Sequence, residues 1–521
     1  MSRLALILAL ILIMPILGLG YALVLPNSSG DTLSHLLNYV LGDYVLTSFI
    51  LILGVGIGIF ILGVGNAWLI ANYQFPGKSI FEWALILPLA VPTYVMAYLF
   101  VDLLQFSGPI QSFIRDITGV HSLSLFDPRS LFGAIWTFSF CLFPYVYLTV
   151  RTSFLDRSAR LIEVAETLGY GQFEAFYRLV LPMARPAIFT GIALALMEVL
   201  ADYGAVSYFG LQTFATGIFK SWLGLGDRVA AVQLSLILLF FVLIIFYWEQ
   251  SNRARLRFVN QNSLSRAVIP KRLRGKKALF AFCFCGITLL FGFILPMLIL
   301  FKLFLLEGFE IDPRFFSWLK NSVQLGVITA FVATALAIFL AYSARISNSK
   351  WLITLNRFIS VGYALPGAVL AVGILSLLGI FEAGWLLSTT TWILIYAYVI
   401  RFLSSGLQNV ELGLGRITPA MDSSAALLGA GALETARRVH LPLLSRSILT
   451  ASLFVLVDVM KELPATLLLR PFNFDTLAVA TYQLAADERL AELALPAFTI
   501  VLVGLIPVIF LSRAISKQRP Y

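Results

Sequence analysis

Long uncharged apolar runs recur along the whole chain and constrain its fold more than any other feature. A helix needs about 20 apolar residues to cross a hydrocarbon layer of ~30 Å. A membrane β-barrel would instead show alternating segments of about ten residues. The sequence therefore predicts an all-α polytopic membrane protein with about twelve transmembrane helices. The expected spans are 4–25, 45–70, 84–101, 131–150, 188–200, 229–248, 278–301, 322–343, 358–381, 386–400, 447–457 and 493–511.

The composition and the location of the charges support this prediction. Hydrophobic residues make up 60% of the chain and charged residues 12%, which excludes an ordinary soluble domain. The net charge of +10 does not indicate a nucleic-acid partner, because much of it lies in residues 253–277. Basic loops stay on the cytoplasmic side of a membrane, so we expect this segment and both termini to be cytoplasmic. Its basic residues are Arg253, Arg255, Arg257, Arg266, Lys271, Arg272, Arg274, Lys276 and Lys277.

The first expected span, residues 4–25, has an alternative interpretation as a cleaved signal sequence. It follows Arg3 and ends among small residues, as signal sequences do. We favour the uncleaved span, because its removal would leave the first half of the chain one helix short.

An internal repeat divides the expected helices into two sets. Gly169 and Gly429 are 260 residues apart, and each is followed at the same distance by Leu-Pro. Pro92 and Pro366 form a second pair, 274 residues apart. Self-similarity of this kind predicts two parallel, pseudo-symmetric six-helix halves. The predicted domains are 1–252 and 278–521, joined by the basic cytoplasmic linker 253–277.

The loops near 160–186 and 420–446 each predict a helix, a turn and a second helix. Glycine permits a positive φ at the turn, and Pro182 or Pro442 permits a fresh helix start at the next span. Two short helices at the cytoplasmic face suit docking in the groove of a partner protein. The alternative is that they lie on lipid headgroups, which their arginines would favour. Because the pattern occurs twice at equivalent places, we favour docking.

The loop pattern Glu-x-Ala-x-x-x-Gly, followed after nine residues by a hydrophobic residue and x-Leu-Pro, resembles the EAA loop of type I ABC importer permeases. The second copy departs from it, because Ser423 and Ser424 replace Glu-Ala and Asp422 comes one position early. The residues that carry the resemblance are Glu163, Ala165, Gly169, Leu181 and Pro182, and Asp422, Ala425, Gly429, Leu441 and Pro442.

This resemblance implies a multi-pass subunit of the bacterial inner membrane that is not itself an enzyme. It implies two cytosolic ABC ATPase subunits, which would hold ATP and Mg, and a secreted solute-binding protein. The chain itself is expected to bind no cofactor. Its nearest approach to a phosphate-binding loop, Gly77-Lys78-Ser79, has Asn72 where the first glycine of that motif belongs.

Two pairs of carboxylates inside expected spans are candidates for a translocation pathway. Glu198 and Asp202 lie four residues apart, as do Asp458 and Glu462 at an offset of 260. A spacing of four would place each pair on one helical face, and ionisable groups within membrane spans point to function. Convergence of all four would suit transient binding of a hard cation such as ferric iron. Alternatively, they cap helices or form ion pairs, with Lys461 beside Glu462.

The segments that follow these carboxylates resemble those of ferric iron permeases. They are 201–210 with 212–218 in the first half, and 461–478 in the second. The resemblance implies alternating-access import of ferric iron delivered by a periplasmic or extracellular binding protein. Fused permeases for thiamine or phosphonates have a similar layout and remain an alternative. A secondary transporter driven by an ion gradient is a third possibility, but it does not explain the paired loops. Candidate contacts for the binding protein are Arg228, Arg470, Asp487, Glu488 and Arg489, although a solvated surface explains them equally well.

Overall fold

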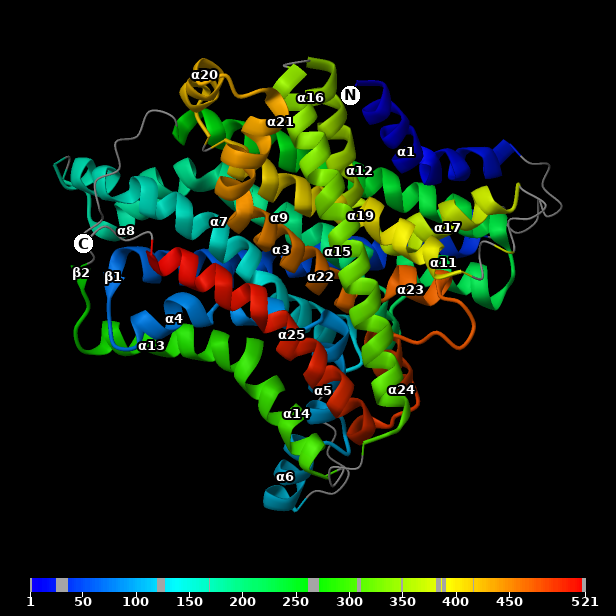
Figure 1. Cartoon of the computed structure of the whole chain (residues 1–521). Coiled ribbons are helices and arrows are strands. Elements are labelled where there is room, and N and C mark those ends of the chain that lie inside the picture. Colours follow the sequence, from blue (N-terminus) through cyan, green and yellow to red (C-terminus); the bar gives the residue numbers. More distant parts are fainter. Residues whose placement is uncertain are drawn as a thin grey trace. The chain divides into compact units, whose positions relative to one another are not determined.

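The computed structural model describes residues 2–24, 36–119, 127–167, 169–260, 271–306, 311–347, 350–380, 386, 390–415 and 417–517. These residues are almost entirely helical, which confirms the all-α prediction (Figure 1). In this part of the chain the strands are β1 (Tyr73–Gln74) and β2 (Lys271–Arg272), which pair in parallel. These two strands connect the predicted linker, residues 253–277, to the residues that follow the helix ending at Asn72.

The chain forms two compact units. One unit contains residues 1–28, 225–236 and 311–480, and the other contains residues 29–224, 237–310 and 481–521. Two helices, α12 (Arg228–Asn260) and α24 (Leu477–Ala486), contribute to both units. The first unit contains α1 (Ser2–Val24), α15 (Arg314–Ser347), α16 (Lys350–Ile359), η6 (Ser360–Ala364), α17 (Gly367–Leu378), α19 (Thr391–Leu414), α20 (Pro419–Leu427), α21 (Ala432–Thr435), η7 (Ala436–His440), α22 (Leu441–Lys461) and α23 (Pro464–Leu469).

The second unit has a related order of elements, but the single helix α7 (Leu131–Thr167) takes the place of two helices of the first unit, α19 and α20. Besides the strands it contains η1 (Leu36–Val40), α3 (Leu41–Asn72), α4 (Lys78–Ala84), η2 (Leu87–Ala90), α5 (Thr93–Leu104), α6 (Pro109–Thr118), α7 (Leu131–Thr167), α8 (Gln172–Ala175), η3 (Phe176–Val180), α9 (Leu181–Ala201), α10 (Gly204–Tyr208), α11 (Phe214–Phe219), η4 (Lys220–Gly224), α13 (Lys276–Leu289), η5 (Leu290–Ile294), α14 (Leu295–Leu306) and α25 (Leu490–Lys517).

The first helices of the two sequence halves are exchanged between the compact units. Helix α1 belongs to the unit that contains residues 311–480, and α13 and α14 belong to the unit that contains residues 29–224. Helix α1 packs against α17, and the backbones approach closely because Gly18 and Gly373 face the crossing without side chains. Helices α13 and α14 pack against α4 and α5, and α25 packs against η2 and α14 (Figure 1). The boundaries 1–252 and 278–521 therefore remain a prediction about the sequence repeat.

The described residues contain nine helices that are long and apolar enough to span a membrane, or eleven if two bent pairs are included. The expected number of twelve is not reached in this part of the chain. The bent pairs correct two expected spans, 84–101 and 358–381. The chain turns by 97° before α5 and by 108° before α17, and Pro92 and Pro366 are the N-caps of these helices. Proline cannot continue a preceding helix and holds the residue before it in an extended conformation.

Candidate coupling loops and translocation site

Both repeated loops have the predicted helix–turn–helix path. In the first, α7 leads to Gly169 at φ 79° and then to α8 and η3. In the second, α20 leads to Gly429 at φ 81° and then to α21 and η7. A Cβ at either glycine would meet no atom within 4 Å. Glycine is therefore required by the left-handed backbone conformation and not by crowding.

The role expected for Pro182 and Pro442 is wrong in one respect. Each proline lies in the first turn of a helix that continues directly from the preceding short helix through a five-residue π turn. The Leu181 N–H reaches the Phe176 carbonyl, and the Leu441 N–H reaches the Ala436 carbonyl. A wider turn of this kind accommodates a residue that lacks an N–H without ending the helix.

The predicted loop residues occupy different environments. Glu163 and Ala165 lie in α7, of which only the backbone is described there, whereas Ala425 is buried. Leu441 and Pro442 are exposed. Sequence reasoning missed Leu427 and Leu428, each 88% exposed immediately before Gly429. Two neighbouring leucines this exposed at the tip of a loop are typical of a surface that another protein covers.

The first loop is attached to its unit by aromatic side chains. Trp68 of α3 lies against Phe176 at 4.4 Å between ring centroids and against Phe154 at 5.6 Å. Phe154 comes from α7 and Phe176 from η3, so one indole contacts both arms of the loop. None of these three aromatic side chains is ionisable, so this contact does not depend on pH.

The second loop is attached at the equivalent place by polar groups. Arg345 of α15 donates to the Asp422 carboxylate at 2.7 Å and to the carbonyls of Leu414 and Ile417 at 2.7 and 3.0 Å. His440 Nε2 lies 2.7 Å from the other Asp422 oxygen. Tyr342, which follows Trp68 by 274 residues, packs edge-on against the His440 ring. Asp422 thus joins the two arms of the loop to α15.

The polar attachment predicts a pH dependence confined to the second loop. Partial burial acts to raise the pKa of Asp422, but hydrogen bonds from Arg345 and His440 outweigh it and lower that pKa. The charged carboxylate is therefore favoured by folding, and its contribution is complete above the ordinary aspartate pKa of about 3.9. It is lost as the pH falls from there through the lowered value. Amide hydrogen exchange, corrected for its intrinsic pH dependence, should show residues 420–440 losing protection in this range.

Two controls accompany this measurement. Asp422→Asn should reduce the pH dependence of the second loop to that of the first, because the equivalent exposed pairs Glu174–Arg178 and Glu434–Arg438 contribute little in either loop. Equal acid sensitivity of both loops would contradict the assignment.

The carboxylates Asp202 and Glu462 are not within helices. Helix α9 ends at Ala201 and α22 ends at Lys461, and each carboxylate follows as the C-cap in an extended conformation. The expectation that the spacing of four sets each pair on one helical face therefore fails. Asp202 accepts from the Ala205 N–H at 2.8 Å, and Glu462 accepts from the Ala465 N–H at 3.1 Å. Each carboxylate caps the short helix that follows, α10 or α23.

The two carboxylates are neutralised differently. Glu462 is 2% exposed and forms an ion pair with Arg401 at 2.6 Å. Asp202 instead accepts a hydrogen bond from the Thr93 hydroxyl. Thr93 corresponds in the repeat to Gly367, where an added Cβ would overlap Arg401 and Glu462. In one unit a guanidinium fills the space that a threonine side chain fills in the other.

Glu198 lies in α9 and Asp458 in α22, one turn before the ends of these helices. The structure contains no group of three or more His, Cys, Asp or Glu side chains that could hold a metal ion within its described ranges. The cation that contacts Glu462 is Arg401. Convergence of all four carboxylates, the pathway role of Lys461 and transient metal binding remain predictions.

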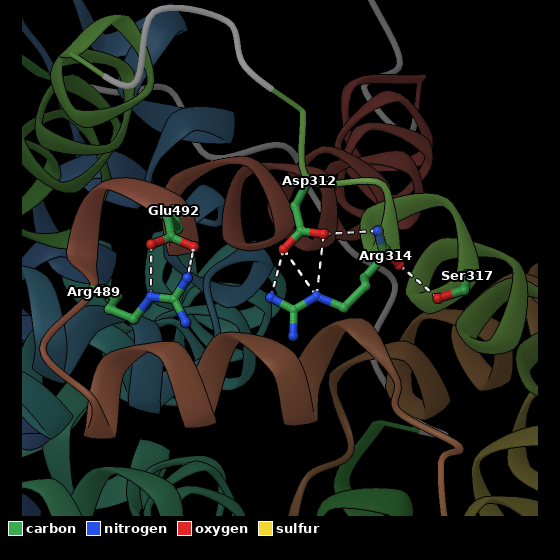
Figure 2. A network of polar contacts seen from close by, with 5 residues as sticks. All are labelled: Asp312, Arg314, Ser317, Arg489 and Glu492. Atoms are coloured by element: carbon green, nitrogen blue, oxygen red, sulfur yellow. Dashed lines mark hydrogen bonds and ion pairs between the residues drawn. The ribbon is translucent and has the colours of Figure 1, made fainter.

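Charges in the connecting segments form local pairs. Arg489, immediately before α25, donates to Glu492 in the first turn of that helix. Arg314, the first residue of α15, makes a two-pronged contact with Asp312 (Figure 2). Arg129 pairs with Glu488 at 3.3 Å. Exposed pairs of this kind contribute little to stability, so these side chains remain available to a partner at small cost.

Comparison with known proteins finds transport permeases that are similar to this chain. Residues 61–257 match the family model described as binding-protein-dependent transport system inner membrane component. The chain is 26% identical over 485 residues to the Fe(3+)-transport system permease protein FbpB 2 of Haemophilus influenzae, covering 92% of this chain and 91% of that protein.

Shorter matches involve other permeases. The molybdenum transport system permease protein ModB of Escherichia coli is 31% identical over 147 residues, 28% of this chain and 62% of ModB. The sulfate transport system permease protein CysT of Escherichia coli is 28% identical over 151 residues, 28% of this chain and 51% of CysT. The chain covers less than two thirds of either protein. The family match includes the first loop, and the iron-permease match extends through both halves. The chain is therefore similar to inner membrane components of binding-protein-dependent transport systems.

Proposed function

We propose that the chain is the fused permease subunit of an ATP-driven importer of ferric iron. The choice of ferric iron as the substrate rests on the match to an Fe(3+)-transport permease, which covers 92% of this chain and 91% of the relative. Matches to the molybdenum and sulfate permeases cover only 28% of the chain.

Coupling to ATP is assigned to the two loops. Each would receive one cytosolic ABC ATPase, which holds ATP and Mg, so the permease itself binds no cofactor. The positive-φ turns at Gly169 and Gly429 and the exposed Leu427–Leu428 pair support this role. Closure of the ATPase dimer would move the loops, and the helices that continue from them would open the passage first outward and then inward. A secreted binding protein would deliver iron on the opposite side, and both termini would be cytoplasmic.

Uptake into vesicles tests the proposal. The permease is reconstituted with a cytosolic ABC ATPase and a solute-binding protein from the same organism, and ferric iron, molybdate, sulfate and thiamine are offered separately. We expect uptake of ferric iron that requires both ATP and the binding protein. Uptake driven by an ion gradient without the ATPase would overturn ATP coupling, whereas ATP-dependent uptake of another solute would overturn the substrate alone.

A further inference from the structure

Hydroxyl-bearing side chains gather where the chain breaks after α9. The hydroxyls of Tyr203 and Tyr482 lie 3.2 Å apart, and the Tyr482 hydroxyl lies 3.3 Å from that of Ser207. The Tyr98 ring packs edge-on against Tyr208 at 4.5 Å between centroids. All five side chains belong to the same compact unit. Together with Asp202 and Thr93 they form what we call the hydroxyl cluster.

Tyr98 gives this cluster an unsatisfied polar group. Its side chain is fully buried, and its hydroxyl has no hydrogen-bond partner among the described residues. The Tyr98 ring packs against Tyr94 at 6.0 Å and against Tyr208 at 4.5 Å between centroids. Leaving a buried hydroxyl unpaired costs about 1–3 kcal/mol. A group with that cost in a folded protein calls for an explanation, and a ligand that it contacts only part of the time provides one.

The repeat supplies an internal comparison. The second half makes the same helix break and the same short capped helix, α23, with aliphatic side chains at the corresponding positions. Tyr98, Tyr203, Ser207 and Tyr208 correspond to Val372, Leu463, Leu467 and Leu468. The fold of this region therefore does not require hydroxyls at these four positions. The hydroxyls of the second copy, from Tyr398 and Thr466, lie instead beside Glu462.

The charge of the cluster also differs from its counterpart. Glu462 is neutralised by Arg401, but no ion pair among the described residues involves Asp202. The position that corresponds to Arg401 holds Cys141. A cation does border the cluster, since Arg129 lies 5.1 Å from the Tyr208 ring centroid, but Arg129 is paired with Glu488. Among the described residues the Asp202 carboxylate is thus held by hydrogen bonds from Thr93, Ala205 and Val206 and not by a cation of the protein.

We propose that the hydroxyl cluster is an oxygen-donor site that binds a hard trivalent cation during transport, with Asp202 and the phenols of Tyr98, Tyr203 and Tyr482 as ligands. This inference rests on the proposed function and names the residues that contact the cargo. Hard cations prefer oxygen ligands, and tyrosine oxygen is an established ligand of iron. Each phenol that coordinates the cation releases its proton to water, so binding weakens as the pH falls.

The test titrates the purified permease with ferric nitrilotriacetate and follows visible absorption, where ferric phenolates show a charge-transfer band. The wild-type protein should develop the band. Tyr98→Phe and Tyr482→Phe should each weaken binding at least about tenfold, since even altering a group that only supports a metal ligand costs about that much. Tyr44→Phe is the matched control, because Tyr44 is 3% exposed, lies in the same unit and is outside the cluster.

The variants separate ligation from folding. Because the Tyr98 hydroxyl has no partner, Tyr98→Phe should leave thermal stability unchanged or slightly raised. A wild-type protein without the band, or a band that survives in both variants, would overturn the site. Iron uptake is measured in parallel. If the wild-type protein shows the absorption band but does not take up iron, the proposed function is contradicted and the proposed binding site is not.

Discussion

Replacing Arg401 by methionine should destabilise the permease by about 3–5 kcal/mol, the usual result of removing one partner of a buried ion pair. Glu462 would remain 2% exposed in a membrane protein without its cation. The same carboxylate accepts the backbone N–H groups of Ala465 and Thr466, so it cannot turn away without uncapping α23. Thermal unfolding of the purified protein in detergent measures the loss.

A double variant isolates the charge. Arg401→Met combined with Glu462→Gln removes both charges but leaves an amide oxygen to cap α23. We expect the double variant to recover most of the stability lost in Arg401→Met. If it is no more stable than the single variant, the loss comes from packing of the guanidinium and not from an unpaired carboxylate.

Hydropathy predicted the long helices but not the helix breaks. Long spans such as α3 are apolar over more residues than a membrane requires, so their existence follows from composition. Residues 84–101 are also apolar, yet the chain turns at Pro92, because burial within the protein satisfies the backbone groups that a break exposes. Proline was the available signal, but membrane helices often contain proline without a sharp turn, as α25 does at Pro496.

The turn of each loop was predictable because it depends on local backbone chemistry. Gly169 and Gly429 need no distant partner to adopt a positive φ. The attachments of the loops were not predictable, since they join residues far apart in sequence. Arg345 reaches Asp422 across 77 positions, and nothing in the local sequence marks the contact. The same holds for Arg401 and Glu462, where the neighbouring Lys461 was the more obvious partner.

The hydroxyl cluster shows a further limit. Its tyrosines come from α5, from α10 with its N-cap, and from α24, and each alone is an ordinary aromatic residue of a membrane protein. Only the three-dimensional contacts show that Tyr482 joins Tyr203 and Ser207. Comparison of the two halves could have raised the question from sequence, because the second copy has aliphatic residues at the positions of Tyr98, Tyr203, Ser207 and Tyr208.

Gly169→Ala and Gly429→Ala should each weaken association with the ATPase by roughly five- to thirtyfold. A residue with a Cβ pays about 1–2 kcal/mol to adopt a left-handed conformation, and both glycines have φ near +80°. The added methyl group meets no neighbour, so the strain acts on the angle between the two arms of the loop and not on the unit below. The dissociation constant of the purified ATPase for the permease in detergent gives the effect.

The chain supplies matched controls for these variants two residues away. Gly171 and Gly431 are exposed, a Cβ on either would also meet nothing within 4 Å, and neither has a positive φ. Gly171→Ala and Gly431→Ala should therefore leave ATPase binding unchanged. Equal weakening by all four substitutions would show that the partner contacts the loop surface at these positions directly. If none of the four substitutions weakens ATPase binding, the proposed coupling role of the loops is contradicted, because the turn geometry can then change without affecting the partner.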